Sequence, residues 1–355
     1  MTRTPRLLVL GFLLATVGID VSALPANAEA PSANQTVRVF SVQRDASTRV
    51  PPVVTGTALS PDGTVLATVG DDHHVRLWNV ADGEPRNVLK GHQDWVRSVS
   101  FNGDGTLLAT AGDDRRIHIW NVSTGKKVQI LPEHDAAIYC ARFSPDSQSI
   151  VAVGFENKLR IYDVATGELR QTFGCPCSDM RTIAYSPDGS LLAGGGRNGQ
   201  VRIWKIADGT TVNEWHGHQQ RIRAMAFSAD GGLLASAGED QTIQIRDMKT
   251  GDTSVHFDSP GAKIQSLAFC GPGFLATGGS DNIVRIWNLT TDKEMQQLKG
   301  HKGSIAALSF NDAAGQLVSG SFDTTARLWN LENSLIEEPS PVAPRLGTRT
   351  AGDSR

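Results

Sequence analysis

The residue types that could carry chemistry in this sequence recur as a set. Two copies stand at equivalent positions: His92, Thr110 and Asp114, and then His301, Ser319 and Asp323. A histidine, a hydroxyl and a carboxylate are the parts of a hydrolase triad. A catalytic site is expected once per domain, so a set that recurs along the chain favours a structural role over catalysis.

Two other signals could bind or form bonds. Asp71-Asp72-His73-His74 offers metal ligands, but adjacent histidines in a tight turn are more typical of a solvated turn. Cys175-Pro176-Cys177 could oxidise, yet a bridge across one residue is strained, and Cys140 and Cys270 map to distant units. We therefore predict no catalytic residue, metal site, cofactor or essential disulfide network.

These residues belong to an internal repeat. Its best marker is one position per unit, which recurs at spacings of 42, 42, 42, 42, 41 and 42 residues: Trp78, Trp120, Tyr162, Trp204, Arg246, Trp287 and Trp329. Each unit has alternating apolar residues, a turn such as Ser60-Pro61-Asp62-Gly63, and a second tight turn. Such turns are typical of hairpins, and no helical period appears. The pattern predicts four short strands in each unit of an all-β protein.

Seven four-stranded units bury their faces by packing radially around a channel. Gly-His near the start and Trp-Asn or Tyr-Asp near the end of each unit resemble the WD-repeat family, over residues 36–331. The resemblance implies a seven-bladed β-propeller of four-stranded antiparallel blades, with repeats ending near residues 79, 121, 163, 205, 247, 288 and 330. It also implies that Thr36–Phe40 supplies the last blade's missing strand, which would remove an exposed sheet edge.

The same resemblance assigns the recurring polar residues to a buried hydrogen-bonded tetrad in each blade. Two units match all four positions: His92, Thr110, Asp114 and Trp120, and His301, Ser319, Asp323 and Trp329. The other units deviate, with Val50, Pro176 or Pro260 at the histidine position, Arg246 at the tryptophan position, and Glu156 or Asn198 at the aspartate position. We interpret these residues as scaffold.

In this family, residues that flank the first apolar position of the inner strand, or precede the turn aspartate, line one face around the channel mouth. Units two to five gather aromatic and arginine side chains there: Trp95, Arg97, Tyr139, Phe155, Arg181, Arg197, Arg221 and Arg223. Such residues dominate binding hot spots, and arginine pairs with carboxylates. We predict a site for an acidic or anionic segment of another protein. A mixed, solvated rim is the alternative, because Asp71, Asp113, Asp179 and Glu239 share this face.

The N-terminus differs from the repeats. Arg3 and Arg6 precede an apolar run of 13 residues, Leu7–Ile19, and Ala26-Asn27-Ala28 follows. This order is typical of a cleaved signal peptide over residues 1–28, with Ala30 as the second choice for cleavage. A helix of that run spans about 20 Å, too short for a membrane span. We predict a linker at 29–35, a disordered tail at 332–355, and an extracytoplasmic (periplasmic or secreted) protein.

Charge and regularity limit the function. The net charge is −3, without the basic excess of a general nucleic-acid binder. The even spacing leaves no room for an inserted domain, which favours a non-enzymatic interaction scaffold that is monomeric on its own. One alternative is a lactonase-like or other hydrolase using Asp71, His73, His74 and Glu239. Another is a glycan-binding module that stacks sugars on Trp95 and Tyr139.

Overall fold

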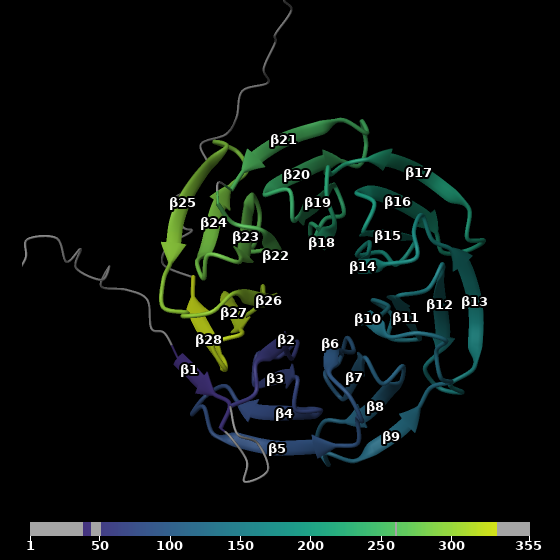
Figure 1. The fold of residues 1–355 in the computed structure, drawn as a ribbon, viewed down its shortest axis with the longest axis vertical. Helices are drawn as coiled ribbons and strands as arrows, with labels where there is room; N and C mark the ends of the chain where they lie inside the picture. The colour runs from purple at the N-terminus through teal and green to yellow at the C-terminus, as the bar shows by residue number, and fades with distance from the viewer. Residues whose placement is uncertain (1–37, 44–50, 260, 332–355) are drawn as a thin grey trace, which may run out of the picture. The chain divides into compact units, whose positions relative to one another are not determined.

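The structure is a computed structural model that describes residues 38–43, 51–259 and 261–331. Over these residues it is an all-β ring of seven four-stranded antiparallel sheets around a channel, which confirms the predicted fold class (Figure 1). The proposed signal peptide (1–28), the linker (29–35) and the tail (332–355) lie outside the described residues.

Each blade starts at the channel with its inner strand. The inner strands are β2 (Val54–Leu59), β6 (Val96–Phe101), β10 (Ile138–Phe143), β14 (Met180–Tyr185), β18 (Ile222–Phe227), β22 (Ile264–Phe269) and β26 (Ile305–Asn311). The second strands are β3 (Val65–Gly70), β7 (Leu107–Gly112), β11 (Ser149–Gly154), β15 (Leu191–Gly196), β19 (Leu233–Gly238), β23 (Phe274–Gly279) and β27 (Gln316–Ser321).

The remaining strands continue outward. The third strands are β4 (His74–Asn79), β8 (Ile117–Asn121), β12 (Lys158–Asp163), β16 (Gln200–Lys205), β20 (Thr242–Asp247), β24 (Val284–Asn288) and β28 (Thr325–Asn330). The outer strands are β5 (Pro85–Lys90), β9 (Lys127–Ile130), β13 (Leu169–Gly174), β17 (Thr211–His216), β21 (Thr253–Asp258), β25 (Lys293–Leu298) and, for the seventh blade, β1 (Arg38–Ser41).

Turn chemistry explains the hairpins that join inner and second strands. In the first, Ser60 donates a 2.5 Å hydrogen bond to Asp62 and accepts one of 2.9 Å from the amide of Val65. Gly63 has a φ of +70°, which residues with a Cβ rarely adopt. The same Ser-to-Asp bond recurs at Ser144, Ser186 and Ser228, so these turns are set locally.

The N-terminal strand closes the ring. β1 pairs antiparallel with β28, from Arg38 opposite Leu328 to Ser41 opposite Thr325. Phe40 is 1% exposed and packs edge-on against Trp78 of the first blade, with ring centroids 5.9 Å apart. The strand begins at Arg38, so the predicted positions Thr36 and Val37 lie outside the described residues. Closure therefore joins the first and last blades through both a sheet and an apolar contact.

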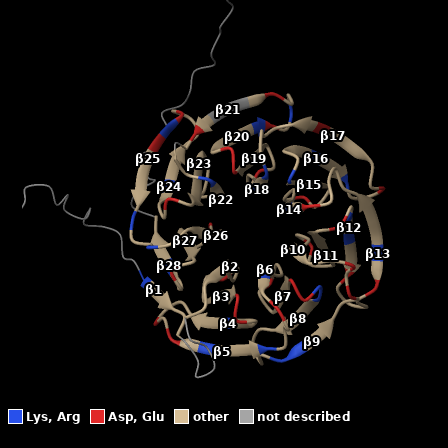
Figure 2. Cartoon of the chain, viewed as in Figure 1, with Lys and Arg blue, Asp and Glu red and all other residues tan. Residues whose placement is uncertain are grey.

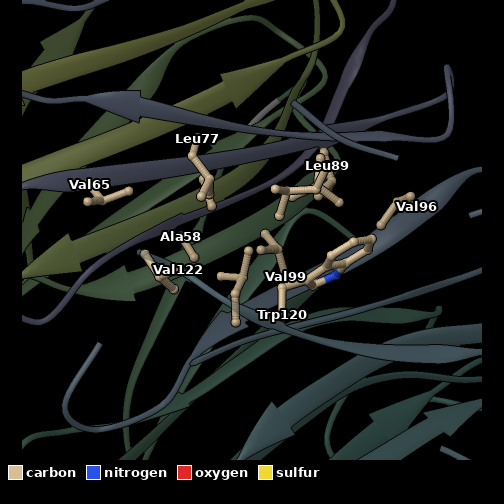
Figure 3. Packing of buried hydrophobic residues seen from close by; sticks show 12 residues of the cluster. Ala58, Val65, Leu77, Leu89, Val96, Val99, Trp120 and Val122 are labelled. Carbon is tan, nitrogen blue, oxygen red and sulfur yellow. The ribbon is translucent and has the colours of Figure 1, made fainter. Parts of the chain in front are cut away.

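The hydrophobic core lies between neighbouring blades. Between blades one and two, Leu77, Leu89 and Val96 pack with Trp120, all buried (Figure 3). Equivalent clusters recur around the ring. Each sheet buries both faces against its neighbours, which explains why single blades depend on the whole array.

Candidate functional site

A β-bulge near the start of every inner strand aims one side chain into the channel mouth. In blade two, Val96 pairs with Gly112 and Ser98 with Ala111, so Arg97 between them has no pairing partner. A Cβ on Gly112 would lie 2.0 Å from the carbonyl oxygen of Trp95, so only glycine allows this approach. Bulges redirect side chains. The bulged residues are Thr55, Arg97, Tyr139, Arg181, Arg223, Gln265 and Ala306.

Tyr139 is the centre of the side-chain cluster that these bulges create. The guanidinium carbons of Arg181, Arg97 and Arg223 lie 4.3, 5.8 and 6.0 Å from the centroid of its ring. Arg223 also donates a 2.9 Å hydrogen bond to the Tyr139 hydroxyl, although the two residues are 84 positions and two blades apart. Each cation is attracted to the negative face of the aromatic ring, so the ring holds the guanidinium groups near it. Residues from blades three and five are thus joined across blade four.

The cluster extends to two exposed aromatic rings. Arg97 lies 4.6 Å from the ring centroid of Trp95, and Arg181 lies 4.5 Å from that of Phe155. Trp95 and Phe155 are 38% and 43% exposed, so they offer apolar surface beside the guanidinium groups of Arg97 and Arg181.

Carboxylates of the same face hold the guanidinium groups in position. Arg97 pairs with Asp113 through two bonds, of 3.0 and 2.6 Å. Asp179 pairs with Arg181 and Arg221, and Glu239 pairs with Arg221 and Arg223. Burial alone would raise the pKa of Glu239, but its two arginines lower it. Three of the four carboxylates that suggested a mixed rim, Asp113, Asp179 and Glu239, are therefore partners of the arginines, so that four guanidinium groups face three carboxylates.

Seven of the eight predicted binding residues thus form one connected group, which we call the Tyr139 cluster: Trp95, Arg97, Tyr139, Phe155, Arg181, Arg221 and Arg223. The eighth, Arg197, is exposed, and among the described residues no side-chain hydrogen bond or ion pair joins it to this group. Phe322, which the register places on this face but which was left out of the predicted set, is 43% exposed and lines the channel.

Sequence reasoning missed a charged residue inside the channel. The inner strands of all seven blades enclose a central space of about 130 Å³, and Arg142 of β10 lies in its wall. The equivalent inner-strand positions carry only small residues: Ala58, Ser100, Ala184, Ala226, Ala268 and Ser309. Comparing this position between repeats would have revealed it.

The buried polar network in blade two runs in one direction. The Trp120 indole donates to Thr110 (2.8 Å), Thr110 bonds to His92 Nε2 (2.8 Å), and His92 Nδ1 bonds to Asp114 (2.7 Å). An indole only donates and a carboxylate only accepts, which sets each donor between them. Burial opposes the charge of Asp114, but the bonds from His92 lower its pKa. Trp329, Ser319, His301 and Asp323 form the same chain in blade seven.

Some deviating units keep a working network. In blade three the Tyr162 hydroxyl bonds directly to His134 Nε2 (2.9 Å), and His134 Nδ1 bonds to Glu156 (3.0 Å). The longer Tyr and Glu side chains remove the need for a hydroxyl residue at Ala152. In blade five His218 bonds to Ser236 and Asp240, while Arg246 lies over Trp215 at 4.0 Å.

The hydrolytic candidates do not form a site of their own. Asp71 accepts a hydrogen bond from the amide of Val53 (2.9 Å), and His74 bonds to Asp72. Glu239 holds arginines in blade five, three blades away around the ring. His73 lies in the turn with a φ of +66°.

One trio of side chains has metal-ligating types. Ligand atoms of His92, Asp114 and His118 lie within 4.8 Å of one another. However, the two imidazole rings stack at 4.1 Å with an 18° interplanar angle, so their in-plane lone pairs do not converge on one ion. Both nitrogens of His92 are also bonded within the network. A metal here would have to break the network.

Comparisons with known proteins agree with this architecture. The family model described as "IFT122 first beta-propeller" matches residues 53–206, and "WD domain, G-beta repeat" matches residues 209–247, 253–288 and 292–330. Together these matches cover most of the described ring. The chain therefore belongs to the WD-repeat family of β-propeller proteins, whose members typically act as non-enzymatic scaffolds for protein interactions.

Individual relatives are similar only over short segments. Mitochondrial division protein 1 of Schizosaccharomyces pombe is 35% identical over 74 residues, 21% of this chain and 11% of that protein. A U3 snoRNP-associated protein-like protein of Arabidopsis thaliana is 40% identical over 60 residues, covering 17% and 12%. The phospholipase A-2-activating protein of Xenopus laevis is 42% identical over 55 residues, covering 16% and 7%. The matches thus span about a tenth of these relatives' own lengths.

Among the described residues, no helix has the length and apolar character needed to cross a membrane.

Proposed function

We propose that the protein is an exported interaction scaffold that binds an acidic or anionic segment of another protein at the Tyr139 cluster. The observation that carries this is the joining of four arginines and three aromatic rings, from four successive blades, at one channel mouth. Tryptophan, tyrosine and arginine supply most of the binding energy at protein interfaces.

The built-in carboxylates support this proposal. Because Asp113, Asp179 and Glu239 hold the guanidinium groups, little side-chain freedom is left to lose on binding. Each arginine has five N–H donors, so donors remain for a partner's carboxylates. Charge elsewhere on the disc is mixed, since both blue and red segments occur around the outer strands (Figure 2). The partner is therefore expected to bind at the mouth.

The test begins with affinity capture of the mature protein from its own extracytoplasmic fraction. The captured partner is then titrated against the unmodified protein, the Arg97→Ala, Arg223→Ala double variant, and the control Arg86→Ala on exposed strand β5. Losing hot-spot arginines costs at least about 1.4 kcal/mol, a tenfold loss of affinity, and the control should bind normally. Unchanged affinity of a folded double variant would reject this surface.

The same material tests export. The arrangement of Arg3, Arg6, the apolar run and Ala28 supports removal of residues 1–28, so we expect Glu29 at the mature N-terminus by mass spectrometry. A chain that keeps residues 1–28 and is recovered only from the cytoplasm would overturn the export proposal.

A glycan-binding function shares the exposed Trp95. The ring of Tyr139, however, has three guanidinium groups within 6.0 Å of its centroid, which compete with a stacked sugar for that ring, so the geometry supports a peptide partner over stacked sugars.

A further inference from the structure

The end of the channel opposite the Tyr139 cluster carries a second hollow of different chemistry. The inner strands begin at the Tyr139 cluster and end at this opening. A cavity of about 570 Å³ lies there, lined by blades three to seven. Most of its wall is aromatic or aliphatic, and its large side chains stand at or next to the ends of the inner strands: Phe143, Tyr185, Phe227, Phe269 and Phe310, with Met225. Its volume is in the range of small-molecule sites, which are mostly apolar with few polar groups.

Arg142 is the cation of this cavity. Its side chain lines both the central channel and the aromatic cavity, so it lies where the two spaces meet. Six of the seven blades have Ala or Ser at this position, so no structural rule of the blade requires an arginine.

The guanidinium of Arg142 is free to bind an anion. Its Nη1 donates one 3.0 Å hydrogen bond to the carbonyl oxygen of Val99. Arg97, Arg181 and Arg223 are each paired with a carboxylate, whereas no ion pair of Arg142 is found within the described part of the chain.

The carboxylates at the cavity rim are engaged elsewhere. Asp230 accepts hydrogen bonds from the Ser228 hydroxyl (2.6 Å) and from the amide of Gly232 (3.0 Å). Asp312 accepts a backbone hydrogen bond from Gly271, in the turn between β22 and β23. The charge of Arg142 is therefore left without a built-in partner.

We infer that this cavity binds a small apolar carboxylate, with its ring or chain against the aromatic wall and its carboxylate on the Arg142 guanidinium. A planar guanidinium recognises a carboxylate through two parallel N–H bonds. The apolar wall accommodates a hydrocarbon body beside that pair. The cavity would thus select for a molecule with one negative end and one hydrophobic end.

The experiment is calorimetric titration of the full chain with phenylbutyrate, and in parallel with phenylbutanol, which keeps the skeleton but lacks the charge. We expect saturable binding of one phenylbutyrate per chain and at least about tenfold weaker binding of the alcohol, a difference of about 1.4 kcal/mol. The Arg142→Ala variant should bind phenylbutyrate about tenfold more weakly, whereas its affinity for phenylbutanol should be unchanged.

Two further variants locate the site. Ala184→Trp places a large ring in the cavity from β14, and should abolish binding of both compounds in a protein that still unfolds cooperatively. Arg86→Ala, which removes an exposed arginine from β5, should bind both normally. Equal affinity for acid and alcohol, unchanged binding by Arg142→Ala or Ala184→Trp, or no binding at millimolar ligand would each overturn the inference.

Discussion

Blades two and four have the same four-stranded sheet, but only blade two contains the buried hydrogen-bonded network. Blade two contains the complete network from Trp120 to Asp114, whereas blade four has Gly194 in the place of Thr110 and Asn198 in the place of Asp114. In blade four the Trp204 indole donates instead to the carbonyl oxygen of Gly174 (3.3 Å). The comparison teaches that a blade does not need the network to form, but that buried polar groups, once present, depend on one another.

Removing the carboxylate of blade two is expected to have the largest effect. Asp114→Ala leaves the Nδ1 donor of His92 and the amide of Gln93 unbonded. Breaking one side of a buried pair costs about 3 kcal/mol or more. The matched Asn198→Ala in blade four changes an exposed residue, and should stay within about 0.5 kcal/mol. Urea unfolding measures both; equal effects would show that the two blades do not differ energetically.

Lowering the pH should destabilise the protein through His118 of blade two. His118 stacks on His92 and is 1% exposed, and burial followed by the neighbouring charge lowers its pKa from 6.5 to about 3. Below pH 6.5, His118 is therefore protonated in the unfolded chain but stays neutral in the folded chain until the pH approaches 3. Stability is fully present above pH 6.5 and is lost as pH falls from 6.5 towards 3, by at most about 1.4 kcal/mol per pH unit before solvent screening.

The control for this effect comes from blade five. There Gln244 holds the position of His118 beside an intact His218–Asp240 pair, so His118→Gln should preserve the network without titrating. Unfolding free energies measured from pH 7 to 4 should fall less steeply for His118→Gln than for the unmodified protein. Parallel curves would exclude His118 as a source of acid sensitivity.

A smaller effect is expected from adding a methyl group to blade four. A Cβ on Gly194 would lie 2.8 Å from Met180 Cε and 3.0 Å from the Trp204 ring. Overpacking of this kind costs about 1–3 kcal/mol, so Gly194→Ala should lower the urea midpoint. Gly174→Ala is the control, because a Cβ there meets no atom within 4 Å. If Gly194→Ala is as neutral as its control, blade four is more loosely packed than the structure indicates.

The fold could be predicted from sequence because its determinants are local and repeated. Alternating apolar residues and the position of Trp78 and its equivalents recur in every unit, and most units carry a turn similar to Ser60-Pro61-Asp62-Gly63. The structure and the family models confirm the seven blades. The predicted binding residues lie largely together for the same reason, since a bulge occupies the same place in each inner strand.

Prediction was weaker wherever repeats differ. Units three and five were grouped with the deviating blades, yet Glu156 with Tyr162, and Asp240 with Ser236, keep histidine networks. Arg142 was not predicted, because the family pattern indicates binding positions only at the other channel mouth. Export, partner and oligomeric state remain predictions.

The sequence by itself determined the number of blades, their strand order and the residues that each repeat presents at the channel, because hairpins and period-two burial depend on near neighbours. Only the tertiary structure decided that Arg223 reaches Tyr139 two blades away, that three rim carboxylates hold the four arginines, and that five aromatic residues at the strand ends line a cavity beside Arg142. These contacts follow from closing the ring. Closure sets the distances between residues that are far apart in the sequence, and no periodicity encodes those distances.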